Sequence, residues 1–147
     1  MDKLKLIVFD FDGVFTNCNL KFRDVNCRDT FGLTYLTKYD VGICTRSDGK
    51  HIPQIILDRV KFVIKNCTSK YKKIMELGYQ EDEIAYMGDD THDLECIKKF
   101  KYSACPKDAH PKVLEYAKFI SNFNGGRGAV REYCDYLVSH HGKITAI

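Results

Sequence analysis

Long apolar runs are missing from this chain of 147 residues. A helix that crosses a bilayer needs about 20 consecutive apolar residues, and no stretch of the sequence approaches that length. A secretory signal peptide is not visible either, because a strand-like run begins at Leu4, almost at the N-terminus. These absences argue against a membrane or secreted protein, and we expect a cytoplasmic one.

A strong excess of charge of one sign is also lacking. The 23 lysines and arginines nearly balance the 20 acidic residues, for a formal net charge of +3. The cluster Lys70, Lys72 and Lys73 is typical of a solvated helix face, so nothing argues for a nucleic-acid partner. With 44% hydrophobic and 29% charged residues, we expect residues 1–147 to form a single globular domain.

The seven cysteines include no C-x-x-C pair, and their number is odd. A secreted disulfide framework favours an even set. We therefore expect reduced thiols that fill the core, as in cytosolic proteins. A zinc site built from scattered cysteine and histidine residues is the less favoured alternative.

Short apolar runs alternate with segments of helical pattern. The strand-like runs cover residues 4–9, 41–44, 61–64, 84–87 and 102–104. The helical segments cover residues 30–38, 49–57, 69–77, 91–98 and 129–139. This alternation predicts a doubly wound α/β fold, Rossmann-like, with a mostly parallel sheet and helices on both faces. Residues Asn17 to Arg28 break the alternation, and we expect a short hairpin or extended excursion there.

Polar residues follow four of the predicted strands, and ligands bind beyond the carboxyl ends of strands in open parallel sheets. These residues are Asp10, Asp12 and Gly13, then Thr45, then Lys70, and finally Gly88, Asp89, Asp90 and Asp93. Phosphoryl transfer through a carboxylate requires such a set. One carboxylate attacks phosphorus, a second moves protons, and donors bind the phosphate oxygens. Magnesium prefers oxygen ligands and is held by one or two carboxylates together with the phosphate.

The motifs in this order resemble those of the haloacid dehalogenase superfamily. Asp10-Phe11-Asp12-Gly13-Val14 resembles the first motif of that superfamily, and Ile43-Cys44-Thr45 resembles its second motif. Lys70 is similar to the third motif, and Gly88-Asp89-Asp90-Thr91-His92-Asp93 to the fourth. By themselves, paired loop aspartates could equally cap a helix or pair with surface lysines. The first and fourth motifs together favour a phosphatase.

Three further segments resemble the 3-deoxy-D-manno-octulosonate 8-phosphate phosphatase family, a branch without a cap domain. They are Asn26 to Asp29, Asp108 to Pro111, and Gly125 to Glu132. The resemblance implies a substrate such as 3-deoxy-D-manno-octulosonate 8-phosphate or another eight- or nine-carbon sugar acid phosphate, in lipopolysaccharide or nonulosonate biosynthesis. It also implies a homotetramer, built through the excursion, with the Gly125–Gly128 loop or the C-terminal tail reaching a neighbour's site.

The same resemblance implies a role for each site residue. Asp10 is the nucleophile and a Mg²⁺ ligand, and Asp12 is the general acid and base and binds Mg²⁺ through its backbone carbonyl. Thr45 and Lys70 bind the phosphate, and Asp89 is the third protein ligand of the metal. Asp93 is expected to orient Lys70, and Asp90 to support the metal's waters. Arg46 and Arg127 are possible substrate contacts.

The sequence departs from the family at three places near the expected substrate entrance. The excursion after Asp12 is several residues shorter than usual, and Arg46 and Thr30 stand where glycine is common. These departures put the identity of the substrate in doubt rather than the chemistry.

Two other functions are compatible with parts of the pattern. A phosphorylation-switch receiver domain also gathers Asp, Thr and Lys, but it places its acceptor Asp after a middle strand, and residues 62–67 offer none. A non-catalytic or weakly active oligomerisation module, related to those on sialic-acid activating enzymes, is the second alternative. His92 is expected to be a helix N-terminal residue rather than a ligand, and His110-Pro111 to start a helix.

Overall fold

A computed structural model describes residues 2–141 of the chain. The expected role of the C-terminal tail, residues 142–147, lies outside the described residues. None of the helices is long and apolar enough to cross a bilayer within this part of the chain.

Six parallel strands form one sheet in the order β3-β2-β1-β4-β5-β6. The strands are β1 (Leu6–Phe9), β2 (Asp40–Cys44), β3 (Phe62–Ile64), β4 (Ile84–Met87), β5 (Tyr102–Cys105) and β6 (Phe119–Ile120). Five of them match the predicted runs within two residues. The sequence did not predict β6, because two residues carry no readable pattern.

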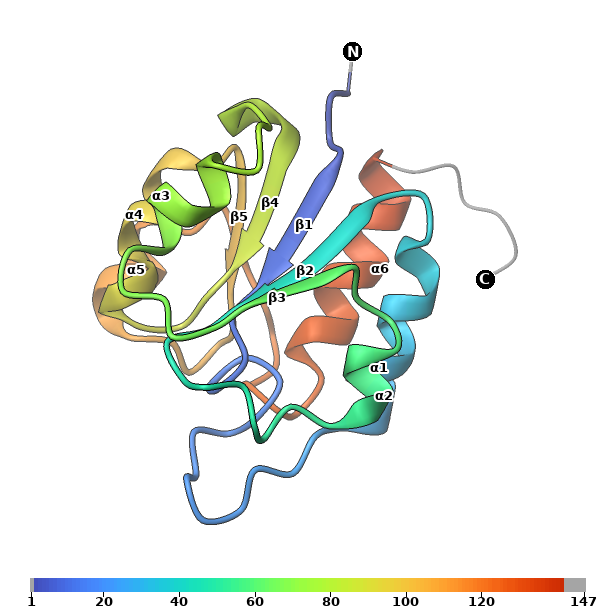
Figure 1. Ribbon diagram of the computed structural model, residues 1–147, viewed down its shortest axis with the longest axis vertical. Coiled ribbons are helices and arrows are strands. Elements are labelled where there is room, and N and C mark those ends of the chain that lie inside the picture. Colours follow the sequence, from blue (N-terminus) through green and yellow to red (C-terminus); the bar gives the residue numbers. More distant parts are fainter. Residues whose placement is uncertain (1, 142–147) are drawn as a thin grey trace.

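Helices cover both faces of the sheet (Figure 1). The helices are α1 (Cys27–Gly32), α2 (Gln54–Leu57), α3 (Lys70–Met75), α4 (Leu94–Lys99), α5 (Pro111–Tyr116) and α6 (Ala129–His141). Three 3₁₀ turns lie between these helices and the neighbouring strands: η1 (Leu33–Leu36), η2 (Glu81–Glu83) and η3 (Thr91–Asp93). The predicted doubly wound fold is therefore confirmed, and no cap domain interrupts residues 2–141.

Alternate residues of β1 point into two separate cores, as the pleat of a strand requires. Ile7 and Phe9 pack with side chains of η1, α2 and α6, whereas Leu6 and Val8 pack with side chains of α3, α4 and α5. Because both faces of β1 are buried, the strand reads as a continuous apolar run rather than an alternating one. This burial holds β1 rigidly in the middle of the sheet.

Local capping explains where two predicted helix starts were wrong. The Asn26 side chain accepts hydrogen bonds from the backbone N–H groups of Arg28 and Asp29, so α1 begins at Cys27 rather than at Thr30. Pro53 disfavours the helical conformation for Ile52, so α2 begins after the proline rather than at Gly49. His110 caps α5 with Pro111 as its first residue, as predicted.

Of the two forms expected for Asn17 to Arg28, the structure has the extended excursion and not the hairpin: residues 17–26 form an irregular extended loop, and 27–28 already belong to α1. Asparagine side chains account for the difference. Asn17 accepts a hydrogen bond from the backbone N–H of Asn19, and Asn19 accepts from Lys21 and Phe22. Such local bonds compete with the pairing of strands. We call residues 17–26 the entrance loop.

Candidate active site

The first site residue follows β1 directly and is buried. Asp10 accepts a hydrogen bond at Oδ1 from the backbone N–H of Phe11, at 2.7 Å. The same Oδ1 lies 3.0 Å from Nζ of Lys70, at the start of α3. Lys70 also donates to Oδ1 of Asp93, at 2.7 Å. One ammonium therefore bridges carboxylates that follow two neighbouring strands, β1 and β4.

Burial and charge oppose each other in this group. Burial disfavours ionisation of Asp10, but the charges of Lys70 and His92 outweigh it and lower the pKa of Asp10 to about 2. For Lys70, burial opposes the charged form, yet Asp10 and Asp93 raise its pKa above the ordinary value. Asp10 is therefore a carboxylate and Lys70 an ammonium ion at neutral pH.

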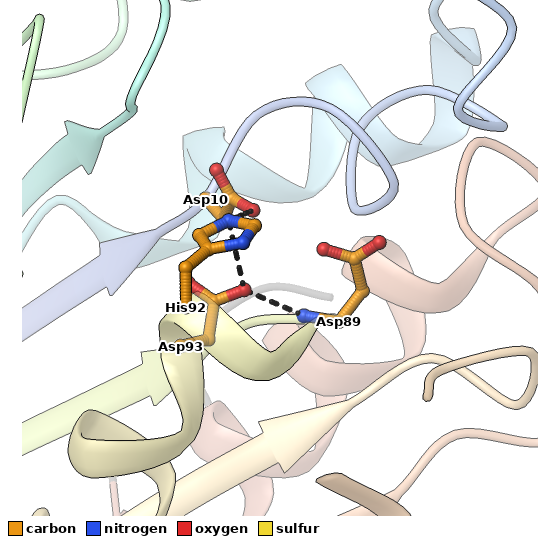
Figure 2. A group of neighbouring side chains, drawn as sticks. All are labelled: Asp10, Asp89, His92 and Asp93. Atoms are coloured by element: carbon orange, nitrogen blue, oxygen red, sulfur yellow. Dashed lines mark hydrogen bonds and ion pairs between the residues drawn. The ribbon is translucent and has the colours of Figure 1, made fainter. Parts of the chain in front are cut away.

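The loop after β4 brings three more side chains to the same point (Figure 2). Nε2 of His92 lies 3.4 Å from Oδ2 of Asp10 and 3.6 Å from Oδ2 of Asp93. Oδ2 of Asp93 accepts hydrogen bonds from the backbone N–H groups of Asp89 and Asp90, at 3.0 and 3.2 Å. Asp93 thus stabilises the turn, and the Asp89 side chain lies beside Asp10 and accepts a hydrogen bond at Oδ2 from the Cys18 thiol, at 3.4 Å.

The carboxyl group of Asp89 is held in an unfavourable place for a negative charge. Burial, together with the neighbouring charges of Asp10 and Asp93, raises its pKa to about 8. Without a cation between them, Asp10 and Asp89 are not both ionised at neutral pH. A bound divalent cation would reverse that balance.

Two glycines allow the loops around this cluster to approach closely. Gly13 has φ of +83°, and a Cβ placed there would lie 1.8 Å from Oδ2 of Asp89. A Cβ on Gly125 would lie 1.9 Å from the carbonyl oxygen of Gly13. The glycine-rich loop before α6 therefore supports the loop after β1 from behind. The reach of this loop to a neighbouring subunit's site stays a prediction.

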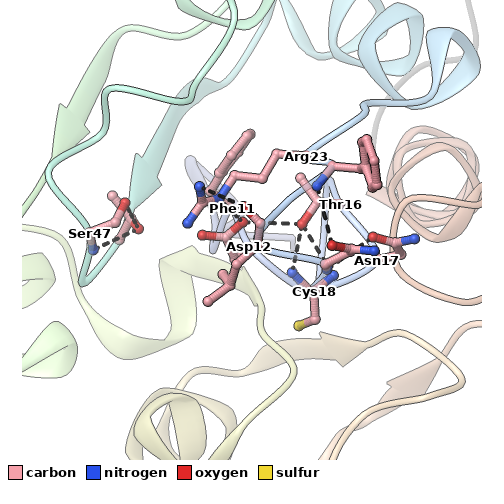
Figure 3. A network of polar contacts seen from close by, with 12 residues as sticks. Phe11, Asp12, Thr16, Asn17, Cys18, Arg23 and Ser47 are labelled. Atoms are coloured by element: carbon pink, nitrogen blue, oxygen red, sulfur yellow. Dashed lines mark hydrogen bonds and ion pairs between the residues drawn. The ribbon is translucent and has the colours of Figure 1, made fainter.

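Asp12 is held at the front of the site by the entrance loop (Figure 3). Its Oδ1 lies 3.2 Å from Nε of Arg23 and accepts a hydrogen bond from the Thr16 hydroxyl, also at 3.2 Å. Arg23 therefore orients the Asp12 carboxylate.

A pocket of about 400 Å³ opens onto this group at the carboxyl ends of β1, β2 and β4. Thr45 follows β2, and its hydroxyl lies 3.0 Å from the Ser47 hydroxyl. The side chains that line the pocket are Asp10, Asp12, Cys18, Leu20, Arg23, Thr45, Arg46, Ser47, Asp89, Asp90 and His92. Lys70 and Asp93 lie buried behind Asp10. The topology thus brings together every predicted site residue except Arg127.

Arg127 is exposed and lines a different pocket, of about 370 Å³, beside α1 and α6. Within one subunit it does not reach the carboxylate cluster, so a substrate contact across a subunit boundary stays a prediction. The reason is the turn before α6. It buries Gly125 and Gly126 against the first loop and leaves the Arg127 side chain on the outer surface.

Sequence reasoning missed five pocket residues, which are Cys18, Leu20, Arg23, Ser47 and His92. His92 lies at the start of η3, as expected, but it also contacts Asp10. Its position inside the acidic motif was the available signal. Cys18 is exposed in the pocket rather than a core residue, and Cys27 is exposed as well, whereas the other five cysteines are buried and all seven are free. No pattern in the sequence distinguished Arg23.

The carboxylate oxygens that dominate the donor set fit a hard divalent cation. Ligand atoms of Asp10, Asp89, His92 and Asp93 all lie within 4.8 Å of one another. Two buried carboxylate oxygens, Oδ2 of Asp10 and Oδ1 of Asp89, have no hydrogen-bond partner within residues 2–141. Unpaired buried carboxylate oxygens are costly unless a cation satisfies them.

A protein-family model described as haloacid dehalogenase-like hydrolase matches residues 58–133, just over half of the chain. The chain belongs to this family. The predicted superfamily is therefore confirmed, and the sheet order differs from the 2-1-3-4-5 order of receiver domains.

Similar proteins agree with this assignment to the haloacid dehalogenase-like hydrolases. The chain is 27% identical to 3-deoxy-D-manno-octulosonate 8-phosphate phosphatase KdsC of Escherichia coli strain K12, over 97% of this chain and 84% of the relative. A crystal structure of the phosphatase of that name from Yersinia pestis is 27% identical, with a TM-score of 0.81, over 97% of this chain and 84% of that one.

A phosphatase of the same name from Moraxella catarrhalis, in complex with magnesium, phosphate and KDO, has a TM-score of 0.86 at 21% identity. The alignment covers 94% of this chain and 87% of that one. At this identity the likeness speaks only for the fold. The prediction that this haloacid dehalogenase-like hydrolase is a phosphatase is confirmed by the family match and by its relatives.

Proposed function

We propose that this protein is a magnesium-dependent phosphomonoesterase that acts on 3-deoxy-D-manno-octulosonate 8-phosphate or a related eight- or nine-carbon sugar acid phosphate. One observation carries the proposal. The buried, ionised carboxylate of Asp10 faces, with a free oxygen, the same pocket as the carboxyl groups of Asp12 and Asp89. The relatives named for the octulosonate phosphate support the substrate.

The chemistry follows from the positions of these side chains. Oδ2 of Asp10 attacks phosphorus, the bond from phosphorus to the sugar oxygen breaks, and protonated Asp12 gives its proton to that oxygen. The Asp12 carboxylate then takes a proton from water, whose oxygen attacks the phosphoaspartate and releases inorganic phosphate. Lys70 stabilises the phosphoryl oxygens, as does Thr45.

Asp10, Asp89 and the backbone carbonyl of Asp12 would hold Mg²⁺, with Asp90 near its waters. When bound, the ion screens the Asp10 carboxylate from the negative charge of the phosphate. Arg46 lines the pocket and is a suitable contact for the sugar carboxylate. That residues 1–147 form a single domain stays a prediction, and so does the cytoplasmic location.

The test is phosphate release by purified protein with magnesium. We expect the octulosonate phosphate to be hydrolysed with a higher kcat/KM than nine-carbon sugar acid phosphates, neutral hexose phosphates or a generic aryl phosphate. Chelation should stop turnover, and added magnesium should restore it. Equal rates on neutral and acidic sugar phosphates would refute the substrate assignment, and activity in metal-free protein would refute the metal.

The stability of the metal-free protein should depend on pH through Asp89. Its folded pKa of about 8 lies above the ordinary value of 3.8, so between these values the folded state holds a proton that the unfolded state has lost. Stability is therefore expected to fall as pH rises through this window. Asp10, with a pKa of about 2, acts in the opposite direction and only below 3.8.

Magnesium should counteract this loss, because it favours the ionised form of Asp89 and binds only the folded state. The rise in Tm caused by saturating magnesium is thus expected to be larger at about pH 8 than at about pH 5. Thermal unfolding with and without metal measures both effects. The variant Asp89→Asn serves as the control, in which the pH dependence should shrink. Equal metal-induced shifts at both pH values would contradict the prediction.

We further propose that the chain forms a homotetramer. The basis is the exposed apolar side chains of the entrance loop and not a hairpin. Leu20 and Phe22 on the entrance loop are 69% and 57% exposed, which is unusual for large apolar side chains on one short segment. Light scattering at micromolar concentration should give about four times the 17.0 kDa chain mass. Replacing both residues by Ser should lower that mass, whereas Leu77→Ser, also at an exposed position, should not. A fully active monomer would exclude the assembly.

A further inference from the structure

We propose that Cys18 and His92 add sulfur and nitrogen donors to the Asp10–Asp89 site, so that it also binds zinc and similar borderline-soft divalent ions in competition with magnesium. The inference rests on the proposed function only in taking Asp10 and Asp89 as the metal-binding carboxylates.

The thiol lies against the metal-binding carboxylate. Sγ of Cys18 lies 3.4 Å from Oδ2 of Asp89, and Cys18 lines the pocket together with Asp10, Asp89 and His92. The sulfur points away from the polar network around Thr16 and Asp12 (Figure 3). It is therefore free to take part in a second interaction.

The backbone at Cys18 adopts a conformation that most residues avoid. Its φ is +68°, in the left-handed region, where a side chain with a Cβ comes too close to the following carbonyl oxygen. Glycine would occupy this position without strain. Strained residues gather at functional sites, so the conformation itself calls for an explanation. Here it places the thiol beside Asp89.

The imidazole of His92 lies beside the other metal-binding carboxylate, that of Asp10. Nε2 of His92 lies 3.4 Å from Oδ2 of Asp10, an oxygen without a hydrogen-bond partner among residues 2–141 (Figure 2). Oδ1 of Asp89 is likewise unpaired within those residues, and the thiol contacts the other oxygen of that carboxyl group, Oδ2. Each of the two carboxyl groups thus has one buried oxygen that a cation would satisfy, and each group has a softer donor in contact with it.

The identities of the donors decide which ions benefit. Magnesium takes oxygen ligands and gains nothing from sulfur, whereas zinc is bound by thiolate, imidazole and carboxylate in four-coordinate sites. When zinc binds, the S–H bond of Cys18 breaks, the proton passes to solvent, and the sulfur lone pair forms the metal bond. Cys18 and His92 therefore raise the affinity of the site for zinc relative to magnesium, compared with a site built from the carboxylates alone.

Cobalt(II) tests the sulfur bond directly. Titrating the metal-free full-length chain with cobalt should produce a near-ultraviolet thiolate-to-metal absorption band that saturates at one equivalent. The band should be lost in Cys18→Ser and in Cys18→Gly. The glycine variant suits the backbone at φ +68° and so keeps the fold. The matched control is Cys27→Ser, which removes an exposed thiol outside the pocket and should retain the band.

Competition with a chromophoric chelator then gives the dissociation constants for zinc and magnesium. We expect the zinc constant to rise by about tenfold or more relative to the magnesium constant in Cys18→Gly and in His92→Asn. A wild-type protein without the thiolate band, or a band that survives in Cys18→Gly, would overturn the proposal. Because both measurements follow binding rather than turnover, failure of the proposed phosphatase function would leave them readable.

Discussion

Asp10→Asn is expected to reduce kcat/KM by roughly four orders of magnitude or more, which corresponds to about 5 kcal/mol of barrier height. The amide cannot form the phosphoaspartate, and it also weakens the metal site. The fold should survive, because one of the charges that disfavour ionised Asp89 is removed. Phosphate release with magnesium measures the loss, and circular dichroism checks the fold.

Asp82→Asn is the matched control for this variant. Asp82 pairs with Lys3 on the surface, at 3.2 Å, and lies outside the pocket. The loss of its charge should leave turnover unchanged, because the residue lies outside the pocket. The fold should persist as well, since exposed ion pairs contribute about 1 kcal/mol or less to stability. A folded Asp10→Asn protein with the activity of the wild type would end the case for Asp10 as nucleophile.

Lys70→Met is expected to damage both stability and activity. The Lys70 side chain is 1% exposed, between Asp10 and Asp93 at 4% and 0%. Removing the ammonium leaves two buried carboxylates without their shared cation, a loss of about 3–5 kcal/mol in the free energy of unfolding. Activity should fall by about 10²–10³, because a donor to the phosphoryl group is gone. Urea unfolding of the metal-free protein measures the first effect.

Two comparisons separate the buried ion pair from a general helix effect. Lys73→Met, on the same helix but exposed, should change the free energy of unfolding by no more than about 0.5 kcal/mol. The double variant Lys70→Met/Asp93→Asn should regain part of the stability, because it removes one of the stranded charges. If Lys70→Met proved as stable as Lys73→Met, the bridge between the two carboxylates would have no energetic role.

Much of the site was readable from the sequence because chemistry and topology coincide in a parallel sheet. Asp10, Thr45 and Asp89 each follow a short apolar run, and the carboxyl ends of parallel strands meet at one edge. Continuous apolar runs also revealed five of the six strands, since buried strands have no polar face. The sequence by itself thus determined the fold class, the order of the elements and the position of the carboxylate cluster.

Side-chain direction and loop shape were decided by the tertiary structure. The pattern of Lys70, Lys72 and Lys73 is that of a solvated helix face, yet packing of α3 buries Lys70 behind Asp10. Asn17 and Asn19 favour the extended form over the hairpin, the two forms that the sequence left open, and the resulting loop brings Cys18 and Arg23 to the pocket. The burial of Lys70 depends on neighbours distant in the sequence, and a pattern read along one chain segment contains no information about them. The asparagine bonds span only two or three residues, but their competition with strand pairing is decided by the fold as a whole.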